Sequence, residues 1–400
     1  MKDFRTLVRF ELKKILSRKM TWIAFGLVFL TMVAYAVIEV TVTRDIKGVQ
    51  ATQYEAERQD KENQKPIIGR TVDDVLVEEA FTALTTSETA FKPYTDVYNV
   101  IVREVCGTAV SNAGTLEKMK EVLGISAAEE LVYAARKIRI ESAMEEQYLT
   151  EKEKDYWREV LENEDSVPWT YEYYVGPYSA LTLAYTAVVL IAVMLAVCLA
   201  NLFADEHQKK TDQLVLCSRN GRKILYWAKL TAGMVFTMVS AGIILLISAV
   251  PQLLIFGTEG LHAPIQLVMP SAMVQMTFGE AIWYCYILTI LAALMYSTII
   301  LCCSELFRNS TVAVVAIIGV LVLLPMLVMV PYEYRVLGQI FDLNPINVVA
   351  IWGFLDYRLV PVLGGFLTMQ QVAPIVYVLL SVVFVIIGRR AYLRYQVGGR

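Results

Sequence analysis

Long apolar segments without charge alternate with polar segments along most of this chain. Five of them lie at residues 178–203, 230–256, 281–304, 311–330 and 372–388, and a sixth lies at residues 20–38. Each is close to the roughly 17–25 residues that cross the apolar core of a bilayer as an α-helix. The pattern therefore predicts an integral membrane protein with six spans, and the apolar content of 56% agrees with it.

The first apolar segment is expected to stay in the mature chain. It is longer than the apolar part of a signal sequence, and it ends near Tyr35, Glu39 and Val40 instead of the small residues typical of a cleavage site. The sequence thus predicts an uncleaved first span.

Lysine and arginine gather before the first span, after the second span and at the C-terminus. By contrast, residues 257–280 contain neither, and residues 331–371 contain only Arg335 and Arg358. Because short basic loops stay on the cytoplasmic side, the distribution places both termini in the cytoplasm.

These observations predict an all-α polytopic membrane protein. We expect a cytoplasmic interfacial helix at residues 1–19, spans at 20–40, 176–203, 230–256, 281–304, 310–331 and 372–390, a helical extracytoplasmic domain at 41–175, a cytoplasmic segment at 204–229 and an external segment at 332–371.

The extracytoplasmic domain has few helix breakers, and its roughly 130 residues can bury a core of their own. The pattern of Ser126 and Glu129 predicts a capping box at the start of a helix. Cys106 is alone in this domain, so it is either buried or bonded to another chain.

An aromatic cluster closes the domain. Tryptophan and tyrosine at such a position favour a belt at the outer membrane interface, with a face for sugars or peptides as the alternative. The cluster consists of Trp169, Tyr171, Tyr173, Tyr174 and Tyr178.

Several kinds of chemistry are missing from the sequence. The chain has no phosphate-binding loop, and its two histidines and scattered cysteines have no metal-ligand spacing. No span has a charged residue well inside it, which argues against an ion-coupled carrier. We expect no catalytic, cofactor-binding or metal site and no nucleic-acid partner, so the energy for any transport must come from another protein.

The N-terminal segment predicts a basic amphipathic helix at the membrane surface, in contact with lipid headgroups. Glu11 falls on its apolar face between Leu7 and Ile15. An acid at this position has either a specific partner or a solvated place at the rim.

The polar segment between the second and third spans has helix-like order. Asp205 and Glu206 stand at its start, leucines run through it, and Arg219, Arg222 and Lys223 form a basic turn. Singly, these cations act as topology signals, whereas together they favour a surface that another protein binds.

Four features resemble the permease subunits of bacterial ABC-2 type ATP-binding cassette transporters. They are the opening Phe10–Lys19 with its embedded acid, the segment from Phe203 through Glu206 and Thr211 to the basic turn, the six-span layout, and the external stretch around Asp342–Pro345. The resemblance covers the membrane portion. Relatives often have a proline-containing turn where this chain has Asn220 and Gly221.

The resemblance implies a multi-pass protein of the bacterial plasma membrane that exports its substrate. It further implies a second permease subunit, identical or different, and cytosolic ABC ATPase subunits that bind ATP and Mg²⁺, with a partly re-entrant external segment. The residues expected to couple the chain to its ATPase are Asp205, Glu206, Thr211, Leu214, Arg219, Arg222 and Lys223.

Two other classes of function stay open. The chain could be a sensor or immunity protein that binds an extracellular peptide or cell-wall ligand without translocation. A polytopic enzyme is less supported, because no cluster of acids, histidines or serine–histidine pairs lies at a membrane edge. The acidic extracytoplasmic domain suggests cationic ligands, but the same charge also keeps a domain soluble.

Overall fold

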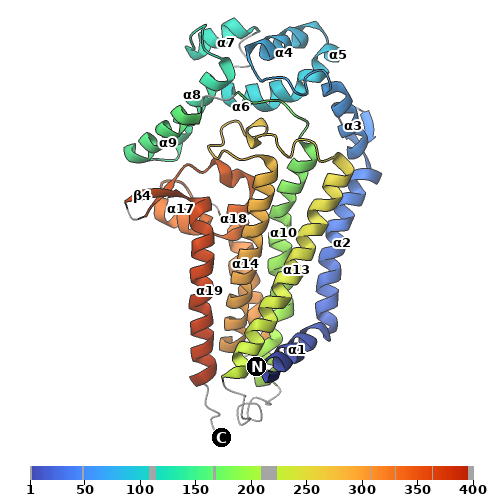
Figure 1. Ribbon diagram of the computed structural model, residues 1–400, viewed down its shortest axis with the longest axis vertical. Coiled ribbons are helices and arrows are strands. Elements are labelled where there is room, and N and C mark those ends of the chain that lie inside the picture. The colour runs from blue at the N-terminus through green and yellow to red at the C-terminus, as the bar shows by residue number, and fades with distance from the viewer. Residues whose placement is uncertain are drawn as a thin grey trace.

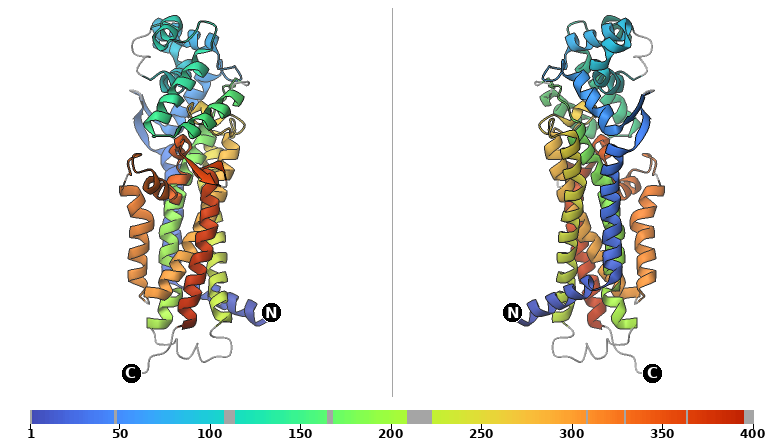
Figure 2. Two further views of the ribbon diagram at one scale, coloured as in Figure 1. Left: turned by 90° about the vertical axis from the view of Figure 1, so that its left-hand side faces the viewer. Right: turned by 90° about the vertical axis from the view of Figure 1, so that its right-hand side faces the viewer.

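The computed structural model describes residues 2–46, 49–107, 114–164, 168–208, 223–307, 309–328, 330–362 and 364–394. An elongated helical bundle has both termini at one end, which we call the terminal end (Figure 1). A mainly helical domain of residues 43–174, the cap domain, stands on the opposite, distal end (Figure 1). The bundle helices follow the long axis, whereas α1 (Lys2–Leu16) projects sideways at the terminal end (Figure 2).

Six helical segments of the described chain are long and apolar enough to cross a membrane, so the predicted fold class is confirmed. They are α2 (Lys19–Thr41), α10 (Val175–Leu199) with α11 (Asn201–Gln208), α13 (Ile224–Phe256), α14 (Phe278–Phe307), α15 (Ser310–Ile317) continued by the π-helix η5 (Ile318–Leu323) and α16 (Leu324–Leu327), and α19 (Met369–Arg394).

Several helix ends differ from the expected boundaries, including those of the third and fifth spans. The third span begins at Ile224 instead of residue 230, because Leu225 and Tyr226 continue the buried face of the helix. The fifth span ends at Leu327 instead of residue 331, where the backbone turns extended at Val328. The helix of the third span therefore includes Lys229, which the sequence placed in a loop.

The second and fourth spans form the centre of the bundle. Within the chain, 72% of the most apolar window is buried for each of these two, compared with 22% for the first, fifth and sixth spans. Small residues such as Ala184, Ala187 and Ala196 are completely buried on α10, where they let neighbouring helices approach closely. At the distal end, a β-carbon on Gly176 would lie 2.0 Å from the carbonyl oxygen of Gly257, so this contact requires glycine.

The cap domain is mainly helical, as expected, with one two-stranded hairpin at its start. Its elements are β1 (Thr43–Ile46), β2 (Val49–Thr52), α3 (Gln53–Gln64), α4 (Asp74–Thr86), α5 (Glu88–Phe91), η1 (Lys92–Tyr94), the π-helix η2 (Val97–Val102), α6 (Arg103–Cys106), α7 (Leu116–Leu123), α8 (Leu131–Glu146) and α9 (Glu151–Glu164). Cys106 is buried with a free thiol, and burial raises its pKa to about 12.

The expected helix start at Ser126 is wrong. Glu129 does accept from the backbone N–H of Ser126 at 3.1 Å, but the residues form a turn. Helix α8 begins at Leu131, whose N–H donates to Asp74 on α4 at 2.7 Å. A side chain distant in sequence thus satisfies the free donor at the start of this helix.

The expectation of a membrane belt is wrong for the central tyrosines of the aromatic cluster. Tyr171, Tyr173 and Tyr174 are at most 6% exposed and are packed inside the cap domain, directly before α10. Tyr171 donates to Asp96 at 3.2 Å, and Tyr173 donates to the carbonyl of Glu57 at 3.1 Å. These hydroxyls therefore bind the segment that leads into α10 to α3 and to the segment before η2.

The distal segment after the fifth span consists of short elements packed on the bundle. They are α17 (Arg335–Asp342), α18 (Pro345–Val349), the 3₁₀ helix η6 (Ile351–Leu355) and the hairpin of β3 (Leu359–Val362) and β4 (Gly365–Thr368), while another 3₁₀ turn, η4 (Ile265–Leu267), lies between α13 and α14. Asn344 caps α18 by accepting from the N–H of Ile346 at 3.0 Å, and its amide donates to the carbonyl of Leu321 in η5 at 3.3 Å.

Polar side chains of the cap domain bind the backbone of this distal segment. Gln147 donates to the carbonyl of Leu355 and accepts from the N–H of Tyr357, both at 2.8 Å. Trp157 donates to the carbonyl of Tyr357 at 2.7 Å. Arg136 donates to the carbonyls of residues 270 and 272 in the other distal loop. The cap domain and the distal loops therefore share one packed interface.

Candidate functional site

Charged residues at the terminal end form a cluster that joins three helices. Glu206 of α11 lies 3.1 Å from Lys14 of α1 and 2.6 Å from Lys229 of α13. Lys14 also lies 3.7 Å from Glu11, one turn earlier on α1. We call Glu11, Lys14, Glu206 and Lys229 the terminal cluster. It connects α1 to the second and third spans.

Lys229 is the most deeply buried member of the terminal cluster, with an exposure of 0%. Its ammonium also donates to the carbonyl of Leu202 at 2.9 Å and lies 4.7 Å from the centre of the Phe203 ring. A buried cation is tolerated only when it is paired and hydrogen-bonded. Lys229 therefore holds the end of the second span against the third.

Glu11 is 2% exposed, and one of its carboxylate oxygens, Oε2, has no hydrogen-bond partner. The acid that the sequence placed on an apolar face is thus buried beside Lys14 and not solvated at the rim.

A second ion pair lies beside the terminal cluster. Arg18, between α1 and α2, donates to Asp205 at 2.8 Å and to the carbonyl of Asn201 at 3.3 Å. Both acids at the end of the second span therefore bind the N-terminal segment.

The break between α10 and α11 is fixed by a serine of the fourth span. The hydroxyl of Ser304 donates to the carbonyl of Ala200 at 2.5 Å and accepts from the N–H groups of Phe203 and Ala204 at 3.2 and 3.1 Å. One buried side chain thus satisfies three backbone groups that the break leaves without a helical partner. The fourth span is therefore linked to the same region as the terminal cluster.

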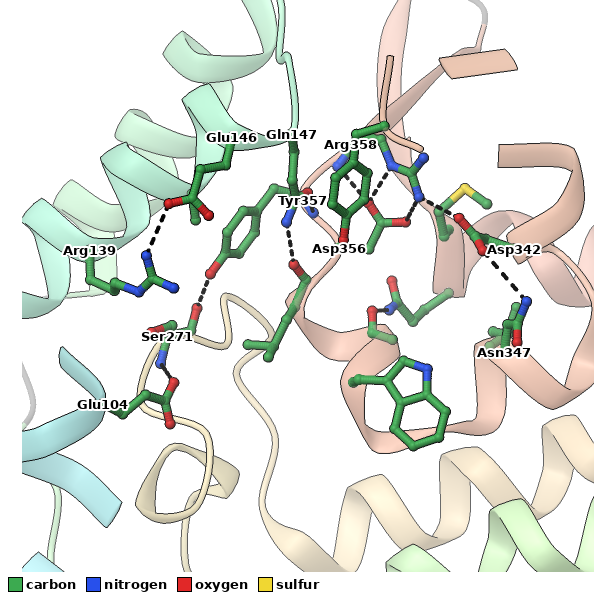
Figure 3. Close-up of a pocket in the computed structure, with 18 residues that line it drawn as sticks. Glu104, Arg139, Glu146, Gln147, Ser271, Asp342, Asn347, Asp356, Tyr357 and Arg358 are labelled. Carbon is green, nitrogen blue, oxygen red and sulfur yellow. Dashed lines mark hydrogen bonds and ion pairs between the residues drawn. The ribbon is translucent and has the colours of Figure 1, made fainter. Parts of the chain in front are cut away.

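At the distal end, a cavity of about 480 Å³ separates the cap domain from the distal segment. Figure 3 shows Arg139 and Glu146 on one side of it and Asp342, Asp356 and Arg358 on the other. Arg358 is 1% exposed and donates to Asp356 and Asp342 at 2.8 and 2.6 Å. Arg139 pairs with Glu146 at 3.3 Å. Each of these charges has an ion-pair partner, while Nη1 of Arg358 is buried without a hydrogen-bond partner.

The remaining acid of this cavity, Glu104, accepts from the N–H of Ser271 at 3.3 Å, and burial raises its pKa. Burial also raises the pKa of Asp342, against the opposing effect of Arg358. Across the described residues, no three histidine, cysteine or acidic side chains are placed to hold a metal ion.

A family model described as "ABC-2 family transporter protein" matches residues 5–394. The chain belongs to the ABC-2 transporter family. The match includes the terminal cluster, all six spans and the cap domain. A comparison with curated proteins finds no match. As an ABC-2 permease, the chain is a membrane component of a transporter, and the family in general works with an ABC ATPase partner.

The seven coupling residues predicted in this ABC-2 permease fall into two groups. Asp205 and Glu206 lie in α11, where they contact Arg18 and Lys14, and Lys223 is exposed directly before α13. The other four lie outside the described residues; they are Thr211, Leu214, Arg219 and Arg222. Contact of any of them with an ATPase stays a prediction.

The sequence treated Lys14, Arg18 and Lys229 only as topology signals and missed their pairing with acids. For Lys229 a signal was available: the apolar pattern continues upstream of residue 230 to Ile224, which places this lysine inside a span. Charges inside spans are rare and almost always paired. For Lys14 and Arg18 the sequence has no comparable signal, because their partners lie 192 and 187 positions away.

Proposed function

We propose that this ABC-2 permease is the membrane subunit of an ATP-driven exporter in the bacterial plasma membrane, with both termini in the cytoplasm. It pairs with a second permease subunit and with cytosolic ATPase subunits, which bind ATP and Mg²⁺. The observation that carries the proposal is the terminal cluster, which is built at the ends of the two helices that flank residues 209–222.

The terminal cluster gives the ATPase a firm connection to the spans. Glu206 stands at the end of the second span, and its pairing with Lys14 and Lys229 joins this end to α1 and to the third span. Ser304 adds the fourth span. A force on the segment between α11 and α13 therefore acts on several spans together, as a switch between inward-open and outward-open states requires.

In this scheme the predicted coupling residues have two roles. Asp205 and Glu206 hold the start of the segment between α11 and α13 against the bundle, through their ion pairs with Arg18, Lys14 and Lys229. The leucine and the basic residues of the segment, with Lys223 at its end, contact the ATPase.

Co-expression with the ATPase encoded beside the chain tests the proposal. The complex is purified through a tag on the ATPase, and its ATP hydrolysis is measured. The double variant Arg222→Glu/Lys223→Glu is expected to lose co-purification or the stimulation of hydrolysis. The matched control is Lys118→Glu/Lys152→Glu, which reverses two exposed charges of the cap domain and leaves both readouts unchanged.

Retention of both assembly and stimulation in the Arg222→Glu/Lys223→Glu variant would contradict the coupling role. Failure of the unmodified chain to co-purify with any ATPase would reject the transporter proposal and favour a sensor or immunity protein.

A further inference from the structure

A second cavity, of about 680 Å³, lies between the cap domain and the distal ends of the first three spans. Its lining includes four carboxylates, from Glu39, Glu57, Asp60 and Asp96, and one guanidinium, from Arg44. These five groups give a formal charge of −3, since four negative charges face one positive charge. We call this space the acidic cavity.

The strongest sign of a missing ligand is Glu39, near the end of α2. Its side chain lines the acidic cavity and is only 9% exposed, yet its Oε2 has no hydrogen-bond partner. Gln252 of α13 and Tyr35 of α2 hydrogen-bond to Glu39, and Oε1 of Gln252 is itself buried without a partner. Buried polar atoms are nearly always satisfied. Both of these are acceptors, so the missing group is a donor.

Two further carboxylates are oriented by neutral donors of the cap domain. Glu57 accepts from the amide of Gln53 at 2.8 Å, and Asp96 accepts from Gln64 at 2.9 Å and from Tyr174 at 3.4 Å. Burial and the negative charges of Asp60 and Asp96 raise the pKa of Glu57. A cation in the acidic cavity would offset this unfavourable charge.

The geometry favours an extended cation over a metal ion. Within the described residues, no three acids, histidines or cysteines come close enough together to hold one metal. The carboxylates are instead spread over α2, α3 and the segment before η2, with Tyr35, Tyr174 and Tyr178 between them. Aromatic faces attract ammonium groups, and the rings and Phe256 give apolar surface for a hydrocarbon chain.

We propose that the acidic cavity binds an organic polycation, a molecule with two or more ammonium groups on an apolar chain. Glu39 accepts from one ammonium group at the inner end of the cavity, and Glu57 accepts from another at the cap domain. Such a ligand is the substrate class only if the proposed transport function holds, whereas the binding itself is independent of it.

The test uses the full chain in nanodiscs of phosphatidylcholine, which carries no net charge. Binding of 1,7-diaminoheptane is measured by calorimetry, with 1,7-heptanediol as the uncharged analogue and Ca²⁺ as the point charge. Saturable binding of the diamine is expected, with none for the diol. Glu39→Gln and Glu57→Gln are each expected to weaken it about tenfold, because a hydrogen bond to a charged group is lost.

The control variant is Glu62→Gln, which removes the same charge from an exposed position on the helix that carries Glu57, and it is expected to bind normally. Thermal unfolding of each variant shows whether it is folded. Because Glu39 and Glu57 lie on different helices, the proposal can still be tested with one variant if the other fails to fold.

The absence of diamine binding would overturn the proposal, and so would binding by both cavity variants that is as tight as that of the natural chain. Ca²⁺ binding that depends on Glu39 and displaces the diamine would overturn the organic class in favour of an inorganic cation. The binding experiment contains no ATPase, so its result is separate from the co-purification test. If the chain binds the diamine but does not co-purify with an ATPase, the transport function is rejected and the cation site is kept. If the chain co-purifies with an ATPase but does not bind the diamine, only the cation site is rejected.

Discussion

At the residue scale, Lys229 and Glu39 are two buried charged residues with different surroundings. At the terminal end, Lys229 is completely enclosed and its charge is matched by Glu206. At the distal end, Glu39 is nearly as buried and keeps an unfilled acceptor. The ion pair of Lys229 fixes structure, whereas the unfilled acceptor of Glu39 lines a cavity and leaves a place for another molecule.

Lys229→Met tests whether the buried ion pair between Lys229 and Glu206 stabilises the fold. The change leaves Glu206 without its fully buried partner and the carbonyl of Leu202 without its donor, so we expect a loss of about 3 kcal/mol or more in stability. Thermal unfolding in detergent measures it. Lys223→Met, at an exposed position just before the same helix, is the control and is expected to change little.

The double variant Lys229→Met/Glu206→Gln sharpens the result. It removes both charges and should recover part of the lost stability. A double variant that is no more stable than Lys229→Met would contradict the pairing as the cause.

At the element scale, α9 is attached to the distal hairpin by one acid. Glu153 pairs with Arg335 of α17, accepts from the N–H of Leu359 at 2.9 Å and accepts from the hydroxyl of Thr150 at 2.7 Å. Burial raises the pKa of Glu153, but these hydrogen bonds outweigh burial and hold it below its ordinary value. The charged carboxylate therefore stabilises the docking of α9.

This pKa has a consequence for the dependence of stability on pH. Because the folded pKa of Glu153 is depressed, its contribution is complete above the ordinary value of 4.5 and is lost as the pH falls through the folded value. Glu153→Gln is expected to cost about 2 kcal/mol at pH 7 and to lose this difference from the natural chain in acid. Melting curves at pH 7, 5 and 3.5 measure it. A difference as large at pH 3.5 as at pH 7 would contradict the charge as its source.

At the scale of the whole molecule, the exposed apolar faces lie on the outer helices of the bundle. Leu254 of α13 and Leu327 of α16 are each 79% exposed, which suits contact with lipid or with a second subunit. The cap domain covers the distal end, and α1 lies across the terminal end (Figure 2). The two ends therefore face different compartments if the bundle spans a membrane.

Cysteine labelling in intact bacterial cells tests the sidedness. A cysteine at the exposed Glu129 of the cap domain should react with a membrane-impermeant maleimide, whereas one at the exposed Ser17 of the terminal end should react only after permeabilisation. The charge bias of the short loops sets this outcome. The opposite pattern would reverse the predicted orientation.

The sequence alone determined the spans, because crossing a bilayer requires long uncharged runs that are visible without any partner. The order of its motifs also indicated the family, which the match over residues 5–394 shows. The position of Glu11 on an apolar face predicted that this acid has either a specific partner or a solvated position. The apolar runs, the order of the motifs and the helical face of Glu11 depend only on residues near one another in the sequence, so the sequence is enough to predict them.

Only the tertiary structure decided how charges and aromatic rings are paired. It brought Glu206 to Lys14 across 192 positions, and Gln147 to Leu355 across 208. It also turned Tyr171 inward, because the cap domain folds back over the start of α10. Such pairings depend on which helices become neighbours, and the identity of the side chains does not specify that. The acidic cavity exists for the same reason, since its carboxylates come from segments that meet only in the folded chain.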